Sequence, residues 1–116
     1  MNTKIQNLWG LDKAPSIKAI LLLLQHKVGP DSFALLDVEQ PNDKAVRIIP
    51  PNNPYEVSAY IYSYSQRRER YGLDLEFPYL IETRADDQTI RLNDLTDADA
   101  VEKIIEHLEL SELNIS

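Results

Sequence analysis

The segment NPYEVSAYIYSYSQRRERYG, residues 53–72, decides how the chain on either side of it is arranged. It contains five of the six tyrosines of the 116-residue chain, and a cluster of three arginines lies near its end. Whether this segment is a helix or a strand is therefore the first question for the fold.

Both ends of the segment carry signals that are typical of a helix. Asn53 can accept a hydrogen bond from the first turn, Pro54 suits the first helical position, and Glu56 completes a capping box. At the other end, Gly72 suits the left-handed residue that follows a helix, and the arginines suit the negative end of the helix dipole. Because both ends are marked, we predict a helix.

This helix would place the tyrosines on two faces. Its core stripe would consist of Val57, Tyr60, Ile61, Tyr64 and Tyr71. The opposite face would carry two outward tyrosines beside the arginines, and these residue types most often anchor protein interfaces. We therefore predict a partner-binding surface made of Tyr55, Tyr62, Gln66, Arg67 and Arg70.

The alternative for the same segment is a strand. In that case Tyr60, Tyr62 and Tyr64 would share one face, and the β propensity of tyrosine favours this arrangement.

Composition indicates one ordinary domain, residues 1–116. With 43% hydrophobic residues the chain can bury a core without disulfides or metal, and it has no cysteine. The apolar run at residues 19–24 is too short to span a bilayer. We therefore expect a soluble cytoplasmic protein.

Charge is unequally distributed along the chain, whose net charge is −7. Residues 1–71 contain 9 Lys and Arg against 7 Asp and Glu, whereas residues 72–116 contain 3 against 12. The acidic half disfavours general affinity for nucleic acid phosphates and favours solubility or a basic partner.

Two further helices flank the central segment. Ser16 is expected to cap a helix over residues 16–27 that Gly29 and Pro30 end, after an irregular lead over residues 1–14. Thr96 is expected to cap the last helix, whose tail frays from Leu110. The buried stripe of this last helix would consist of Val101, Ile104, Ile105 and Leu108.

Two hairpins complete the predicted elements. Residues 33–38 and 44–49 alternate so that Leu36 lies opposite Ile48 and Asp37 lies opposite Arg47. Residues 73–83 form one strand, or two that Pro78 separates, followed by a turn at Asp86 and Asp87. In this second hairpin the pairs would be Ile81 with Leu92 and Glu82 with Arg91.

The resulting order is α-β-β-α-β-β-α. Hairpin-linked strands pair in antiparallel fashion, which predicts an α+β domain with a four- to five-stranded antiparallel sheet and helices mainly on one face.

No motif specifies a chemistry. The three glycines form no phosphate-binding loop, and His26 and His107 lack the spacing of paired metal ligands. The acidic residues Asp94, Asp97 and Asp99 lack the glycine and the terminal glutamate of a calcium loop. We predict no catalytic, cofactor-binding or metal-binding residues, and we do not expect an enzyme.

The function that these observations favour is a small acidic binding or regulatory module that acts through protein–protein contacts and self-associates. One alternative is a nucleic-acid-associated protein that uses Arg67, Arg68 and Arg70. Another is a small enzyme of unspecified chemistry.

Overall fold

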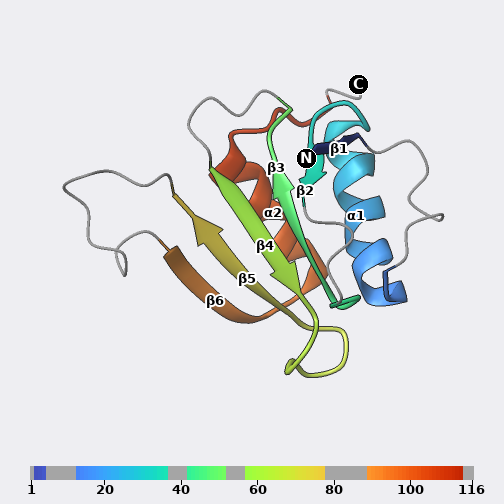
Figure 1. Cartoon of the computed structure of the whole chain (residues 1–116), viewed down its shortest axis with the longest axis vertical. Helices are drawn as coiled ribbons and strands as arrows, with labels where there is room; N and C mark the ends of the chain where they lie inside the picture. The colour runs from blue at the N-terminus through green and yellow to red at the C-terminus, as the bar shows by residue number, and fades with distance from the viewer. Residues whose placement is uncertain (1, 5–12, 37–41, 52–56, 78–88, 114–116) are drawn as a thin grey trace.

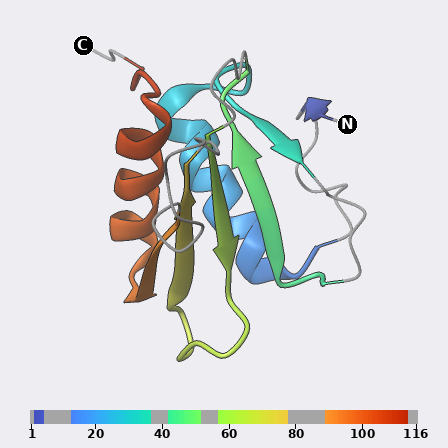
Figure 2. The ribbon, with the colours of Figure 1, turned by 60° about the vertical axis from the view of Figure 1, so that its left-hand side comes forward.

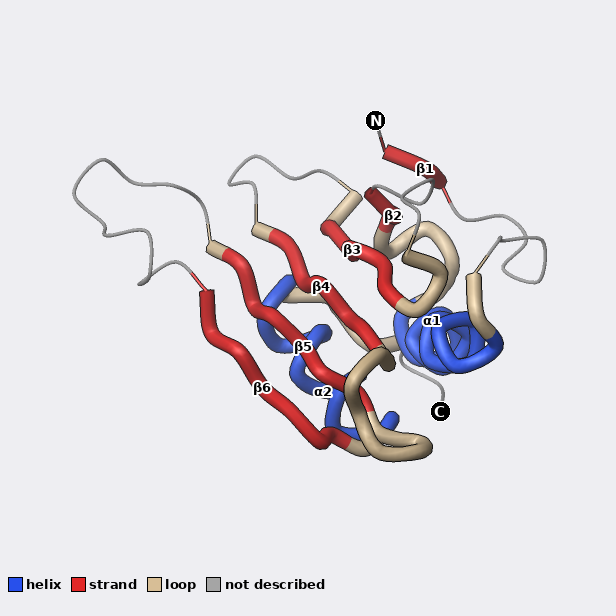
Figure 3. The backbone as a smooth tube through the Cα atoms, turned by 60° about the horizontal axis from the view of Figure 1, so that its bottom comes forward, coloured by secondary structure: helices blue, strands red, loops and turns tan. Residues whose placement is uncertain are grey.

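The computed structural model describes residues 2–4, 13–36, 42–51, 57–77 and 89–113. Its elements are, in order, β1 (Asn2–Lys4), α1 (Pro15–Val28), β2 (Ala34–Leu36), β3 (Ala45–Ile49), β4 (Ser58–Tyr62), β5 (Tyr71–Glu76), β6 (Thr89–Leu95) and α2 (Asp97–Leu108). Within these residues the strands form one antiparallel sheet of six, ordered as in the sequence, with both helices on one face (Figure 1, Figure 3). The predicted α+β class, with an antiparallel sheet and helices on one face, is confirmed.

The sheet forms one layer of the structure and the two helices form the other (Figure 2). The core lies between these two layers. Strand residues whose side chains point to the helices line up across the sheet in two rows, because paired residues in antiparallel strands share a face. One row contains Leu35, Ile48, Ala59 and Leu75, and the other contains Val46, Ile61 and Leu73. The helices close this layer with Ile17, Ile20, Leu21 and Leu24 of α1 and with Ala100, Val101, Ile104 and Leu108 of α2.

The predicted central helix is wrong, because residues 58–62 form β4. In a strand Ala59 and Ile61 both point into the core, where each is completely buried, whereas the helical stripe would have left Ala59 outside it. Serine, tyrosine and isoleucine are also moderate helix formers, and tyrosine and isoleucine pack well on a pleated sheet. Local propensity and tertiary packing therefore agree on the strand alternative.

Gly72 and the arginines, which predicted the end of the central helix, have other roles in the structure. Gly72 lies inside β5 opposite Tyr62, and the arginines lie in the turn over residues 63–70 that joins β4 to β5. Asn53, Pro54 and Glu56 lie outside the described residues.

The predicted register of the first hairpin needs correction. Leu36 lies opposite Arg47 and not Ile48, a shift of one residue that places Leu35 in the core. In the second hairpin Leu92 lies opposite Leu73 and Arg91 lies opposite Asp74, and the predicted partners Ile81 and Glu82 lie outside the described residues.

Both flanking helices lie where they were predicted, but Ser16 does not cap α1. The helix begins at Pro15 with Ala14 as its N-cap and without a side-chain cap, and the Ser16 hydroxyl hydrogen-bonds to the Ser63 hydroxyl over 2.7 Å. The Thr96 side chain accepts a hydrogen bond from the Asp99 backbone N–H, and Gly29 follows α1 with a φ of 91°. Residues 2–4, expected within an irregular lead, instead form β1 at the edge of the sheet. The segment expected to fray is held at residue 113, where the Leu113 N–H donates to the Lys27 carbonyl over 2.7 Å.

Candidate interaction face

The face of the sheet opposite the helices carries three of the four described tyrosine side chains, while the fourth, Tyr71, belongs to the core. Since Ala59 and Ile61 point to the core, Tyr60 and Tyr62 point to the other side, and Tyr64 joins them from the start of the turn. We define the tyrosine face as Arg47, Tyr60, Tyr62, Tyr64, Asp74 and Arg91.

Four planar groups on this face form a continuous row. The Arg47 guanidinium lies 5.0 Å from the centroid of the Tyr60 ring. The Tyr60 and Tyr62 centroids are 5.7 Å apart at a tilt of 36°, and the Tyr62 and Tyr64 centroids are 4.7 Å apart with an interplanar angle of 22°. Separations of this size are those at which aromatic pairs attract beyond simple burial. The row holds each ring in a defined position.

Tyr62 is the central ring of the row and is only 6% exposed. Its ring occupies the space above Gly72, and its hydroxyl donates a long hydrogen bond of 3.4 Å to Asn93 Oδ1. Burial, with a smaller contribution from Asp74, raises the pKa of Tyr62. The prediction that Tyr62 is an exposed residue is therefore wrong. Its side chain points away from the helices, but its ring packs against Gly72 of the neighbouring strand and is nearly buried.

The flanking tyrosines are less buried. Tyr60 and Tyr64 are both half-buried. Burial first, and then a hydrogen bond with Tyr64, raise the pKa of Tyr60 to about 12. The Tyr60 phenol is therefore uncharged near neutral pH, and it can donate and accept hydrogen bonds.

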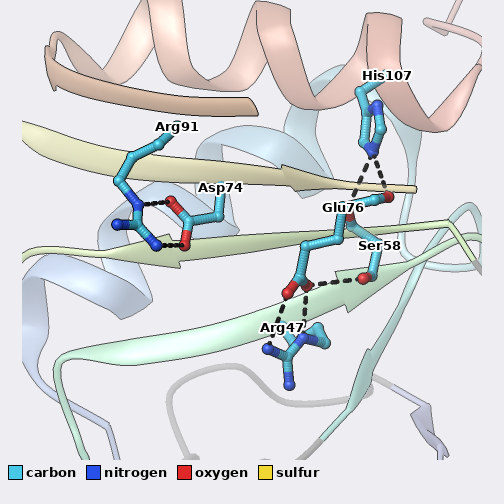
Figure 4. Close-up of polar contacts among 6 residues, drawn as sticks. All are labelled: Arg47, Ser58, Asp74, Glu76, Arg91 and His107. Carbon is cyan, nitrogen blue, oxygen red and sulfur yellow. Dashed lines mark hydrogen bonds and ion pairs between the residues drawn. The ribbon is translucent and has the colours of Figure 1, made fainter. Parts of the chain in front are cut away.

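Ion pairs neutralise the charged groups around the row (Figure 4). Arg47 makes a two-pronged contact to the Glu76 carboxylate, at 2.7 and 3.2 Å, and the Ser58 hydroxyl donates to the same carboxylate over 2.8 Å. Arg91 contacts Asp74 at 3.1 and 3.4 Å. Two cations and two anions leave this part of the face without net charge.

The turn over residues 63–70, which we call the arginine turn, is tied to β6. Arg67 donates to both carboxylate oxygens of Asp94 at 2.8 and 2.6 Å, and Arg70 lies 3.6 Å from the same group. Gln66 accepts from the Asp94 backbone N–H over 2.9 Å and donates to Asn93 over 3.3 Å. The hydrogen bond from Arg67 is the main reason that the pKa of Asp94 is lowered.

Left-handed backbone conformations are concentrated in this network. Ser65, Glu69 and Asp94 have φ angles of 57°, 62° and 59°, and none of them is glycine. Such residues cost free energy and persist only where surrounding contacts determine them. The contacts of Asp94 with the turn supply this restraint.

On its other side the arginine turn borders a groove of about 620 Å³. Arg68 and Glu69 line this groove together with the first residues of α1 and α2. Arg68 is exposed.

The structure thus divides the predicted partner-binding residues. Gln66, Arg67 and Arg70 lie together as predicted, but they contact Asn93 and Asp94 of the same chain. Tyr62 is buried, and Tyr55 lies outside the described residues.

The strand alternative placed Tyr60, Tyr62 and Tyr64 on one face, as the structure does, but the predicted partner-binding surface contained neither Tyr60, Tyr64 nor Arg47. The signal for the tyrosines is their alternation with Ile61 and Ser63, the pattern of a strand with one exposed face. No such signal exists for Arg47, since its contacts to Tyr60 and Glu76 depend on the order of three strands.

His107 of α2 lies on the helix-covered side of the sheet. Its Nε2 lies 2.9 Å from the Ser58 carbonyl and 3.0 Å from the Glu76 carbonyl, on two adjacent strands (Figure 4). Carbonyl oxygens only accept, so Nε2 carries a proton and donates to both. His107, in the last turn of α2, is therefore a half-buried residue that joins this helix to β4 and β5.

Two features are absent from the described residues. No group of three or more histidine, aspartate or glutamate side chains there could hold a metal ion. Of the two helices, neither is long and apolar enough to cross a membrane.

Comparison with known proteins gives no relative for this arrangement: no protein-family model, no curated protein and no solved structure matches the chain.

Proposed function

We propose that this chain is a binding module that recognises a protein partner through the tyrosine face and the arginine turn, and that it also self-associates. The observation that carries the proposal is the row of Arg47, Tyr60, Tyr62 and Tyr64 on the face without helices. Tyrosine and arginine offer large contact areas, and rings that are already held in place lose little conformational freedom on binding.

Tyr64 is the contact residue that this arrangement favours most. It lies at the end of the row, half-buried, and its ring contacts Tyr62 at 4.7 Å. Tyr62 is its support, because a nearly buried ring cannot itself offer much area to a partner.

The arginine turn adds a rigid element beside Tyr64. Its contacts to Asp94 hold the loop in one conformation, so a partner would not have to order it on binding. The groove beside Arg68 offers a concave surface next to this loop.

Nucleic acid binding receives less support from the same geometry. Two of the three arginines, Arg67 and Arg70, contact Asp94. The Asp94 carboxylate would therefore compete with phosphate groups for these two side chains. A protein partner remains the class that the tyrosine row favours.

The proposal can be tested with matched baits. Wild type, Tyr64→Ala and Lys103→Ala, an exposed change on α2, would be immobilised in the same native lysate, and the captured protein would be identified and purified. In calorimetry with this protein, we expect Tyr64→Ala to lower affinity by more than about fivefold and Lys103→Ala to leave it unchanged. Circular dichroism would confirm that both variants are folded.

Two results would contradict the proposal. One is equal affinity of Tyr64→Ala and wild type for the purified partner. The other is a captured nucleic acid whose affinity falls steeply with salt, the behaviour of phosphate-dominated binding.

A further inference from the structure

The outer edge of β6 is open in the described part of the chain. β6 is the last strand of the sheet and pairs only with β5 among the described residues (Figure 3). An edge strand presents backbone N–H and C=O groups that can pair with another strand. Ile90 near its beginning is 48% exposed, although it belongs to the helix-covered side of the sheet.

The usable part of this edge is limited by its backbone. Asp94 has a φ of 59°, which interrupts the extended conformation, and the register with β5 shifts between Tyr71 and Leu73. Residues 89–93 therefore form the segment that can pair with a further strand.

This segment is complementary to a second copy of itself. In an antiparallel pair with its two-fold axis at Arg91, Ile90 lies opposite Leu92 of the second copy, and Thr89 lies opposite Asn93 of the second copy. Apolar residues then meet on the helix side, and polar residues meet on the other side.

The one conflict in this register is resolved inside each copy. Arg91 would lie opposite Arg91 of the second copy, and like charges directly opposite are destabilising. Each Arg91, however, contacts Asp74 of β5, on the side of β6 that faces away from the open edge (Figure 4). The pair neutralises the charge and draws the guanidinium away from the axis.

We infer that two copies of this chain associate through their β6 edges and form one continuous antiparallel sheet with Arg91 at the axis. The inference deepens the self-association proposed above by naming its surface, and it is independent of the tyrosine face as a site for another protein. A five-residue edge forms a small interface, and small interfaces are weak, so we expect dimers at concentrations on the order of 100 µM.

The first test uses matched changes of exposed apolar residues. Ile90 and Leu113 are 48% and 50% exposed, and Leu113 lies far from β6 in sequence and after α2. In sedimentation equilibrium we expect the mass of wild type and Leu113→Lys to rise from 13.3 kDa toward twice that value with concentration. Ile90→Lys should remain at the monomer mass while its circular dichroism stays that of a folded chain.

The second test addresses the register. Asp74→Asn leaves two unpaired arginines opposite each other, so we expect the dimer dissociation constant to increase severalfold. Adding Arg91→Gln removes both charges and should restore association. A structural loss at Asp74 would not be repaired by this second change.

The outcomes separate the two proposals. If Ile90→Lys dimerises like wild type, self-association stands and the β6 edge is not its surface. If wild type stays at 13.3 kDa throughout, self-association and the edge inference both fail, and the edge is left for an extended segment of another protein. If the double variant Asp74→Asn, Arg91→Gln does not regain dimer association, the register centred on Arg91 is wrong.

Discussion

At the scale of single residues, Tyr62 and Gly72 form one packing unit across β4 and β5. The Tyr62 ring occupies the position that a side chain on residue 72 would need, so a Cβ there would overlap Cε2, Cζ and the hydroxyl oxygen. Gly72 is required here for close approach, since its φ is not among the positive values that only glycine adopts readily.

We therefore expect Gly72→Ala to destabilise the wild-type chain by about 1–3 kcal/mol, the usual cost of overpacking. In the Tyr62→Ala background the same change should cost almost nothing, because the overlapping ring is gone. Tyr62→Ala alone should cost about 3 kcal/mol, and more than Tyr60→Ala, since Tyr62 is the more buried ring. Urea unfolding of the four members of the cycle measures the coupling, and equal costs of Gly72→Ala in both backgrounds would refute it.

At the scale of elements, His107 couples α2 to the end of the β4–β5 pair. Its Nε2–H is shared between the carbonyls of Ser58 and Glu76, and its ring makes an edge contact with Phe77 at 4.8 Å. Ser58 and Glu76 are also register partners, so one imidazole ties a helix to two strands at the same level of the sheet.

We expect His107→Ala to lower the free energy of unfolding by about 1–3 kcal/mol, because two carbonyls lose their donor. His107→Gln should recover part of this loss, since its amide can donate to one of them. The matched control is His26→Ala on the exposed last turn of α1, which should stay within about 0.5 kcal/mol of wild type. Indistinguishable urea midpoints for His107→Ala and His26→Ala would show that the contact contributes nothing.

At the scale of the whole molecule, buried phenols limit stability in alkali. Burial raises the pKa of Tyr60 to about 12 and also raises the pKa of Tyr62 and Tyr71, so the folded chain holds these protons more tightly than the unfolded chain. The resulting stabilisation is fully present below pH 10, the ordinary tyrosine value, and is lost as the pH rises through about 12.

We predict that the free energy of unfolding falls between pH 10 and about 12, the window set by Tyr60. Tyr60→Phe should show a shallower fall in the same window, because it removes one titrating phenol. Urea unfolding at stepped pH, with phenolate absorbance recorded in parallel, provides the measurement. An unchanged slope in Tyr60→Phe would remove Tyr60 from the explanation.

Local sequence was sufficient for those elements whose signals lie within one or two turns. The cap at Thr96 and Asp99, the end of α1 at Gly29 and the apolar stripe of α1 each depend on neighbours three or four residues away, so periodicity and capping identify them. The α+β class and the antiparallel pairing follow from the same short-range patterns.

Tertiary structure decided the rest, because the deciding contacts join distant residues. Capping signals alone favoured a helix at residues 58–62, and only pairing of β4 with β3 and β5 buries both Ala59 and Ile61. Arg47 meets Glu76, 29 residues away, and Arg67 meets Asp94, 27 residues away, and no spacing rule connects either pair. The tyrosine face could therefore be anticipated as an alternation in the sequence, but its ion pairs, its buried central ring and its locked turn exist only once the sheet has assembled.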